Sequence, residues 1–362
     1  MQTTYEGKIN LRHYLNADGT VSTPLPEWAK EPDWLLACYR NMVLARTMDN
    51  KAIALQRTGQ LGTYASLLGS EAIDVTLGMM MQPEDVLVPY YRNHASQLLR
   101  GMSIEESLLY WGGDERGNAS AGQHQDFPNA VPIATQSMHA CGVASAIKLR
   151  GEKRVAVTVC GDGGTSKGDF MEALNVAGAW QLPVVFVINN NQWAISVPRS
   201  LQCAAPTLAQ KALGAGIRGE QVDGNDAIAM RESLQIALNR AREGKGPGLI
   251  EAISYRLSDH TTADDATRYR DNDELKAAWE QEPVKRLRLY LHQQGWWDQT
   301  QETDWQDNVS LQVQSAVETY LATPAQPVES LFDYLFAELP ESLREQREWA
   351  MVKAMAGGSH HE

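Results

Sequence analysis

Cysteine is scarce in this chain, long apolar runs are missing, and basic residues are fewer than acidic ones. The 362 residues include four cysteines, Cys38, Cys141, Cys160 and Cys203, and no CxxC pair. This scarcity argues against a thiolate metal cluster or a redox dithiol. No run of about 18 uncharged apolar residues occurs, and the polar start MQTTYEGKIN does not look like a signal peptide. We therefore expect a cytoplasmic protein that does not enter a membrane.

The charge of the chain also limits its partners. The net charge is −13, from 45 acidic and 32 basic residues, and lysine and arginine do not gather in one segment. Nucleic acids and anionic membrane surfaces are recognised by basic patches, so neither is an expected partner.

The length allows a large core, and an α/β domain with helical extensions is the expected architecture. An irregular N-terminal arm precedes two helical patterns, at about 33–61 and 70–81, and a third helical pattern covers 226–243. We divide the chain into an arm with helices (1–83), an α/β domain with an active-site loop (84–273), a helical region (274–356) and a disordered tail (357–362, GGSHHE).

The α/β domain is predicted to contain a mostly parallel sheet flanked by helices. Short β-branched and apolar runs bounded by turn residues indicate its strands. These runs lie at 86–91, 155–160, 184–189, 219–222 and 249–255.

The most informative feature is a pair of polar turns that follow two of these strands. The run 155–160 ends in Gly161-Asp162-Gly163-Gly164, and a helical pattern begins near Gly168. The next strand, 184–189, ends at Asn191, which lies 29 residues after Asp162. A strand-helix-strand crossover is right-handed and places both carboxyl ends on one sheet edge, so Asp162 and Asn191 should meet there.

These residue types suit a metal-bound diphosphate. A carboxylate and an amide oxygen are ligands that Mg²⁺ prefers, and phosphate oxygens complete the shell. Gly161, Gly163 and Gly164 lack a β-carbon and let the backbone approach phosphate. The helix that begins near Gly168 adds free amides and the positive end of its dipole.

Other interpretations of the same residues stay open at this point. A glycine-rich turn is often only a tight connection, and an asparagine run is often only a polar turn. A Rossmann fingerprint fails because its third glycine would fall at Ser166, and a Walker loop fails because Gly168 follows Lys167. Another metal-diphosphate enzyme, such as a nucleotide-dependent transferase, and an inert scaffolding subunit are the two alternatives.

A family resemblance narrows these options. The stretch GDGGTSKGDFMEALNVAGAWQLPVVFVINNNQWAIS resembles the GDG-to-NN motif of thiamine-diphosphate enzymes. Its form is that of the alpha subunit of the decarboxylating component of 2-oxo acid dehydrogenase complexes. Further segments resemble that family in the same order along nearly the whole chain: QRTGQLG from Gln56, GSEA from Gly69, VPYYRNH around Tyr91-Arg92, QVDGND from Gln221, YRLSDHTTADDATRYR from Tyr255, and GWW from Gly295.

The resemblance implies the ligands of thiamine diphosphate and Mg²⁺. It assigns the metal to Asp162, Asn191 and the backbone carbonyl of Trp193, and the diphosphate to Tyr91 and Arg92. A guanidinium group can donate two hydrogen bonds at once to phosphate oxygens. Without the motif, Arg92 would be interpreted as an ordinary surface arginine.

The same resemblance gives roles to residues outside the paired turns. Val131 and Ile133 match positions whose backbone meets the aminopyrimidine ring, and Thr135-Gln136 matches a monovalent-cation site of branched-chain relatives. His260 matches the catalytic histidine of the active-site loop, where an imidazole with a pKa near neutral suits proton transfer. Thr261 matches a regulatory phosphoserine of mammalian relatives.

A partner is implied by what the chain does not contain. In this family a glutamate on a separate pyrimidine-binding domain activates the cofactor. Only the diphosphate-binding half is recognisable here, so a beta subunit should supply the other half in an α2β2 assembly. The lipoyl domain of an acyltransferase should take the acyl product.

Pyruvate is the expected substrate, with branched-chain 2-oxo acids second and acetoin third. The segments GDGGTSKGDF, NNNQWAIS and LAQKALGAG resemble bacterial pyruvate enzymes, whereas residues 132–136 and GWWD resemble branched-chain ones.

Overall fold

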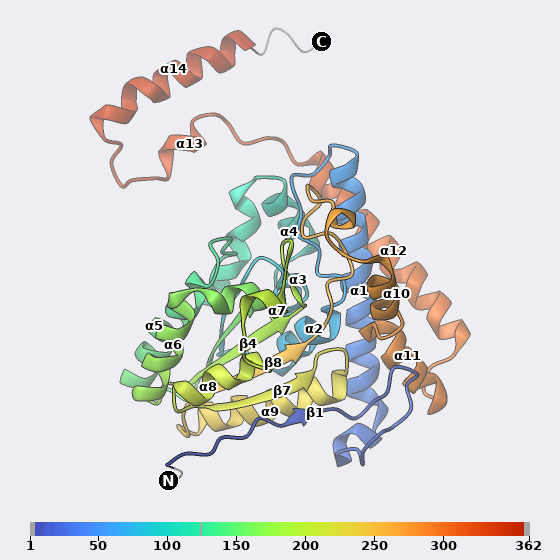
Figure 1. The fold of residues 1–362 in the computed structure, drawn as a ribbon. Coiled ribbons are helices and arrows are strands. Elements are labelled where there is room, and N and C mark those ends of the chain that lie inside the picture. Colours follow the sequence, from blue (N-terminus) through green and yellow to red (C-terminus); the bar gives the residue numbers. More distant parts are fainter. Residues whose placement is uncertain (1–3, 124, 358–362) are drawn as a thin grey trace. The chain divides into compact units, whose positions relative to one another are not determined.

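The computed structural model describes residues 4–123 and 125–357. The chain divides into two compact units, Met1–Glu318 and Thr319–Glu362 (Figure 1). The first unit contains the sheet and its flanking helices. The second contains the end of α12 (Gln299–Ala322) and the helices α13 (Ser330–Asp333) and α14 (Glu341–Gly357).

A six-stranded parallel sheet forms the centre of the first unit (Figure 1). The sequence predicts the parallel sheet and five of these strands, but not β1, which lies in the arm expected to be irregular. Its spatial order is β1-β7-β8-β4-β3-β2, and every neighbouring pair is parallel. The strands are β1 (Leu11–Arg12), β2 (Val86–Val88), β3 (Ala156–Gly161), β4 (Val184–Asn190), β7 (Arg218–Asp223) and β8 (Gly248–Ile253).

Helices cover both faces of this sheet, which explains why its central strands are apolar on both sides. In β4, Phe186 and Ile188 face a core shared with α5 (Thr135–Leu149) and α6 (Gly168–Ala179). The alternate residues Val185 and Val187 face a second core, built with α2 (Glu71–Met80) and α9 (Ala227–Arg242).

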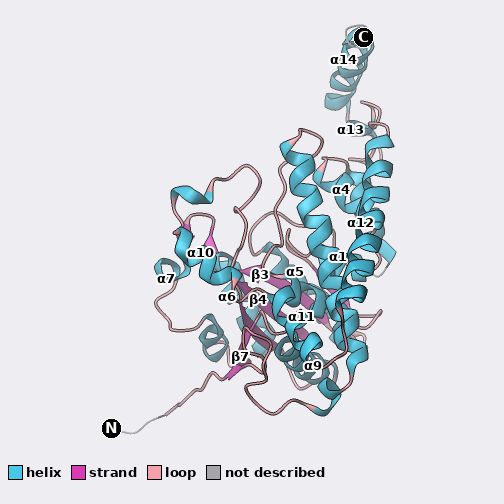
Figure 2. Ribbon diagram, turned by 90° about the vertical axis from the view of Figure 1, so that its right-hand side faces the viewer, coloured by secondary structure: helices cyan, strands magenta, loops and turns pink. Residues whose placement is uncertain are grey.

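A second layer of helices surrounds α2. The long helix α1 (Pro32–Arg57) packs on α2 and on α11 (Pro283–Gln293). Figure 2 shows α1 beside α12, and the Trp305 indole on α12 donates to the carbonyl of Arg40 at 3.2 Å. The remaining helices are α3 (His94–Leu99), α4 (Ile104–Trp111), α7 (Arg199–Gln202), α8 (Lys211–Gly214) and α10 (Asn272–Trp279).

Several boundaries differ from the sequence prediction. The helix expected at 33–61 ends at Arg57, because Gly59 adopts a positive φ of 76°. The strand expected at 86–91 ends at Val88, because the chain turns toward the cavity described below. A 3₁₀-helix, Asp162–Ser166, precedes α6, and a small ribbon pairs β5 (Trp193–Ala194) with β6 (Val197–Pro198); neither was predicted.

The two ends of the chain complete the comparison. Of the tail expected at 357–362, Gly357 is the last residue of α14, and 358–362 lie outside the described residues. No helix among the described residues has both the length and the apolar character needed to cross a membrane.

The two-sided burial of β4 generates a stability prediction. Phe186 is 1% exposed and meets Phe170 edge to face, so Phe186→Ala should lower the free energy of unfolding by about 3–5 kcal/mol. Leu149→Ala, at a site that is 88% exposed, should change it by less than about 0.5 kcal/mol. Urea unfolding followed by circular dichroism measures both. Equal effects of the two substitutions would contradict this assignment of the core.

Candidate active site

A cavity of about 230 Å³ lies where β3 and β4 end. The parallel register sets Gly161 beside Asn189, so the two polar turns that follow these strands share one edge of the sheet. All eleven site residues predicted from the sequence line this cavity: Tyr91, Arg92, Val131, Ile133, Gly161, Asp162, Gly163, Gly164, Asn191, Trp193 and His260.

Asp162 places a buried carboxylate in the cavity. The residue is 2% exposed, and burial raises the pKa of its side chain to about 6. The amide of Gln202 donates to its Oδ2 at 3.0 Å, and Asp162 forms no ion pair within the described part of the chain. Gln202 comes from α7 and could not be predicted, because nothing in its sequence context sets it apart.

The three consecutive asparagines have different surroundings. Asn189 donates to Ser70 and to Tyr90, and Asn190 donates to Glu251, so both hold the sheet edge together. Only Asn191 lines the cavity. Its Oδ1 accepts from the backbone amide of Trp193 at 3.3 Å, which folds the turn back on itself.

The glycines of the first turn serve different purposes. A β-carbon on Gly163 would come within 2.5 Å of the Ala194 β-carbon, and one on Gly164 would come within 3.1 Å of the Cys160 β-carbon. These two glycines therefore permit close packing. Gly161 differs, because its φ of −75° suits any residue and a β-carbon there would meet nothing within 4 Å. Its missing side chain leaves room in the cavity.

Two buried arginines bring positive charge to this region: Arg92 lines the cavity, and Arg256 lies behind the lining residues His260 and Trp193. Arg92 is 3% exposed and donates to the carbonyls of Ser66 and His260. Arg256 is 1% exposed and donates to the Ile195 carbonyl and, at 3.4 Å, to the Trp193 carbonyl. Neither guanidinium is ion-paired with a carboxylate among the described residues. Burial lowers the pKa of Arg256.

His260 lies between these arginines. Its Nδ1 accepts from Arg92 at 3.0 Å and lies 3.4 Å from Arg256 Nη1. Burial, followed by the charges of Arg92 and Arg256, lowers the pKa of His260 to about 3. The expectation of a pKa near neutral was therefore wrong. With Nδ1 accepting, the hydrogen of the neutral ring sits on Nε2.

The loop that carries His260 is fixed by its own polar groups. Asp264 accepts from the His260 amide at 2.9 Å and from the hydroxyl of Tyr269. Arg256 also donates to that hydroxyl, at 2.7 Å. Thr261 faces away from the site and lines a separate cavity beside the end of α1.

The remaining predicted residues lie at the rim and floor. Val131 and Ile133 are 55% and 44% exposed, which is unusual for apolar side chains beside a cavity. Gln136 is buried and donates to the Val159 carbonyl at 2.7 Å, while its Oε1 has no partner. Thr135 begins α5 and does not line the cavity.

In open α/β sheets, ligands bind in the crevice outside the carboxyl ends of the parallel strands, and the cavity lies at that place, so the protein is of the class of α/β proteins with a ligand site at this edge. Sequence comparison identifies the family within this class. The pattern that defines the dehydrogenase E1 component family matches residues 39–329, and the chain belongs to that family.

Two similar relatives come from Staphylococcus aureus and Staphylococcus epidermidis, and both are named pyruvate dehydrogenase E1 component subunit alpha. Each is 38% identical to this chain over 347 residues, which cover 95% of this chain and 93% of the relative. The family resemblance found in the sequence is thereby confirmed.

The surroundings of His260 predict its titration. The folded-state pKa of about 3 lies below the ordinary value of 6.5, so between these values the unfolded chain binds more protons. The contribution of His260 to stability is therefore complete above pH 6.5 and is lost as the pH falls toward 3. An NMR titration can follow this, because the imidazole signal that disappears in His260→Gln belongs to His260. Its chemical shift should remain that of a neutral ring down to about pH 5. A midpoint near 6.5 would contradict the burial between two arginines.

Proposed function

We propose that this chain is the alpha subunit of a pyruvate dehydrogenase E1 component, which decarboxylates pyruvate oxidatively and reductively acetylates the lipoyl group of an acyltransferase. The main support is that all eleven predicted site residues line one cavity. The chain that contains this cavity is 38% identical to subunits of that name. Branched-chain 2-oxo acids and acetoin are not favoured, because those relatives are named for pyruvate.

Membership of the family implies thiamine diphosphate as the cofactor. When bound, it supplies a nucleophilic thiazolium carbon and a ring that accepts electrons. The residues fit a diphosphate, because Arg92 lines the cavity, Arg256 lies behind His260, and neither guanidinium is ion-paired within the described residues. Gly161 and Tyr91 line the same cavity, and a β-carbon on Gly161 would meet nothing within 4 Å, so space is left there.

We assign Mg²⁺ to Asp162, Asn191 and the Trp193 carbonyl. All three residues line one cavity and carry a side-chain or backbone oxygen, and the Asp162 carboxylate is buried without a cationic partner in the described chain. A hard cation offsets the cost of burying that charge and suits this donor set. The unpartnered Oε1 of Gln136 offers one acceptor for the monovalent cation suggested by the sequence.

His260 is the proposed catalytic residue. Because Arg92 occupies its Nδ1, the neutral ring presents Nε2–H as a hydrogen-bond donor. We propose that this Nε2–H group orients the substrate, and later the acyl group during its transfer, by a hydrogen bond. The proton stays on Nε2.

A beta subunit is required to complete the site. The described residues contain one six-stranded parallel sheet, which corresponds to the diphosphate-binding half. The exposed Val131 and Ile133 at the rim fit contact with the pyrimidine-binding half and its activating glutamate in an α2β2 assembly. We expect this assembly in the cytoplasm, because all four cysteines are unpaired.

The metal assignment predicts the effect of removing one carboxylate. Asp162→Ala should abolish magnesium-dependent binding of thiamine diphosphate and leave the circular dichroism spectrum unchanged. Asp169→Ala removes a carboxylate that is 42% exposed on α6 and serves as the matched control. Titration calorimetry on the α2β2 complex measures both affinities, with ATP as the comparison ligand. Unchanged affinity in Asp162→Ala would refute the assignment, and tight ATP binding would favour a nucleotide-dependent enzyme.

The partner assignment predicts where activity resides. The purified chain alone should not decarboxylate any 2-oxo acid, because the activating glutamate belongs to the other subunit. The reconstituted α2β2 complex should turn over pyruvate faster than 2-oxoisovalerate. Activity in a preparation free of the beta subunit would contradict the shared site, and an inactive complex would favour a scaffolding role.

A further inference from the structure

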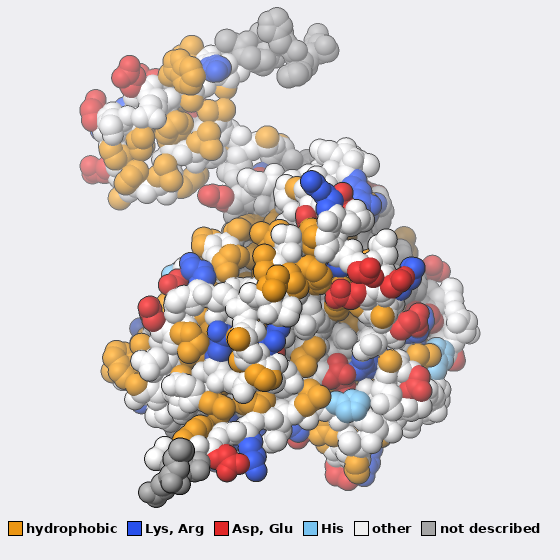
Figure 3. Space-filling model, viewed as in Figure 1, with side chains coloured by type: hydrophobic (Ala, Val, Ile, Leu, Met, Phe, Trp, Pro, Cys, Tyr) orange, Lys and Arg blue, Asp and Glu red, His pale blue; other side chains and the backbone are white. Residues whose placement is uncertain are grey.

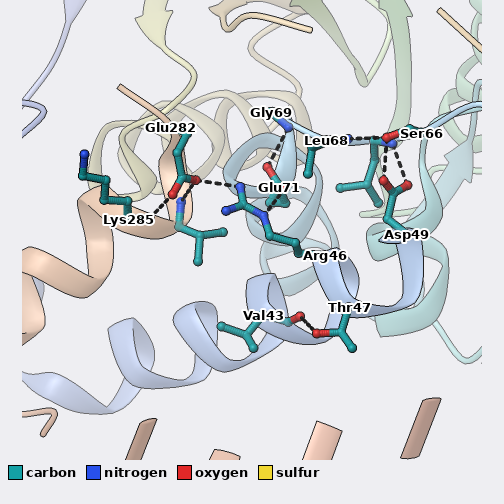
Figure 4. A network of polar contacts seen from close by, with 12 residues as sticks. Val43, Arg46, Thr47, Asp49, Ser66, Leu68, Gly69, Glu71, Glu282 and Lys285 are labelled. Atoms are coloured by element: carbon teal, nitrogen blue, oxygen red, sulfur yellow. Dashed lines mark hydrogen bonds and ion pairs between the residues drawn. The ribbon is translucent and has the colours of Figure 1, made fainter. Parts of the chain in front are cut away.

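Asp49 is a fully buried carboxylate in α1 that holds a segment beside the active site. Its Oδ1 accepts from the Tyr64 hydroxyl at 2.9 Å and from the Leu67 amide at 2.8 Å. Its Oδ2 accepts from the Ser66 hydroxyl at 2.5 Å (Figure 4). The residue is 0% exposed, and no cation pairs with it among the described residues.

The segment that Asp49 holds, residues 64–68, supports the loop that carries His260. The Thr262 amide donates to the Tyr64 carbonyl at 2.9 Å, and the Tyr64 amide donates to Thr262 Oγ1 at 2.9 Å. The Leu257 amide donates to the Leu68 carbonyl at 3.2 Å. These contacts lie on both sides of His260 and attach the loop to the segment.

The same segment also fixes the arginine of the cavity wall. Arg92 Nη1 donates to the Ser66 carbonyl at 2.6 Å, and Arg92 Nη2 donates to the His260 carbonyl at 2.5 Å and to Nδ1 at 3.0 Å. Asp49 touches neither the cavity nor Arg92, but it holds the hydroxyl of the residue whose carbonyl orients Arg92.

We propose that Asp49 is a positioning residue, which holds segment 64–68 and through it sets both Arg92 and the His260 loop. A buried carboxylate that forms no ion pair is costly, and burial raises the pKa of Asp49 overall, although the charge of Arg92 acts in its favour. The three hydrogen bonds that Asp49 accepts fix the path of segment 64–68, which is neither helix nor strand and so has no regular backbone hydrogen bonds to fix it. The proposal rests on the proposed function for the cofactor, the lipoyl substrate and the catalytic role of His260, but the exchange readout on the loop does not.

A neighbouring polar network provides a matched control. Arg46, also on α1, donates to Glu71 at 2.8 Å and to Glu282 at 2.6 Å, and Glu282 also accepts from amides at the start of α11 (Figure 4). Glu282 is 6% exposed and does not line the cavity, and the network joins α1, α2 and α11. Glu71 also accepts from the Gly69 amide, but Glu282 itself contacts no residue of segment 64–68 in the described chain. Glu282→Gln therefore perturbs a buried carboxylate of the same helix layer.

The experiment compares Asp49→Asn with Glu282→Gln in the α2β2 complex. Asp49→Asn should raise the half-saturating concentration of thiamine diphosphate about tenfold and lower kcat for lipoyl acetylation by a similar factor. About tenfold is the effect expected from the loss of one hydrogen bond to a charged group. Hydrogen exchange at the amides of Leu257 and Thr262 should become faster. Glu282→Gln should lower Tm and leave these readouts unchanged.

Single-bond variants keep the test decisive if Asp49→Asn does not fold. Tyr64→Phe and Ser66→Ala each remove one donor to Asp49 and should give smaller shifts in the same direction. Exchange measured on the full chain alone does not depend on activity. A wild-type complex without decarboxylase activity would refute the proposed function and leave that exchange test intact. A folded Asp49→Asn whose loop exchange and cofactor saturation match those of Glu282→Gln would overturn the positioning role.

Discussion

The parallel pairing of β3 with β4 is the constraint on which the rest of the site depends. Six register pairs from Ala156–Val184 to Gly161–Asn189 fix where both strands end, and the chain turns there because the next residues are glycine, aspartate and asparagine. The crossover through α6 makes this pairing obligatory, since its apolar face has to cover the sheet. Every predicted ligand residue then reaches one cavity without further adjustment of the core.

Charge is distributed around this cavity in an unusual way. Arg92 and Arg256 are buried and both contact the neutral His260, while Asp162, the one carboxylate among the described lining residues, accepts from an amide instead of a cation. Two other buried arginines are ion-paired, Arg100 with Asp126 and Arg286 with Asp223, whereas the buried Arg270 donates to backbone carbonyls. The burial of unpaired positive and negative groups costs folding energy, which the proposed metal-bound diphosphate would offset on binding.

The sequence predicted five strands of the parallel sheet and the eleven cavity residues because these depend on local period, turn chemistry and motif. It missed β1 and the strands of the β5–β6 ribbon, which are two residues long and have no apolar run. It did not identify Gln202, Arg256 or Asp49, whose roles arise from contacts between segments distant in the chain. The neutral state of His260 was also missed, since a pKa follows from neighbours that only the folded chain provides. The 3₁₀-helix after Asp162 escaped prediction because so short a turn has no apolar period.

Arg92 contacts the His260 loop twice, through the backbone carbonyl and through the ring. An anion that binds to the Arg92 guanidinium changes the free energy of these two contacts. The affinity for the anion and the order of the loop therefore depend on each other. Thermodynamic reciprocity then requires that whatever immobilises the loop alters the affinity for the anion by an equal factor. A protein that docks on the loop from outside thereby acts on the cofactor without touching it.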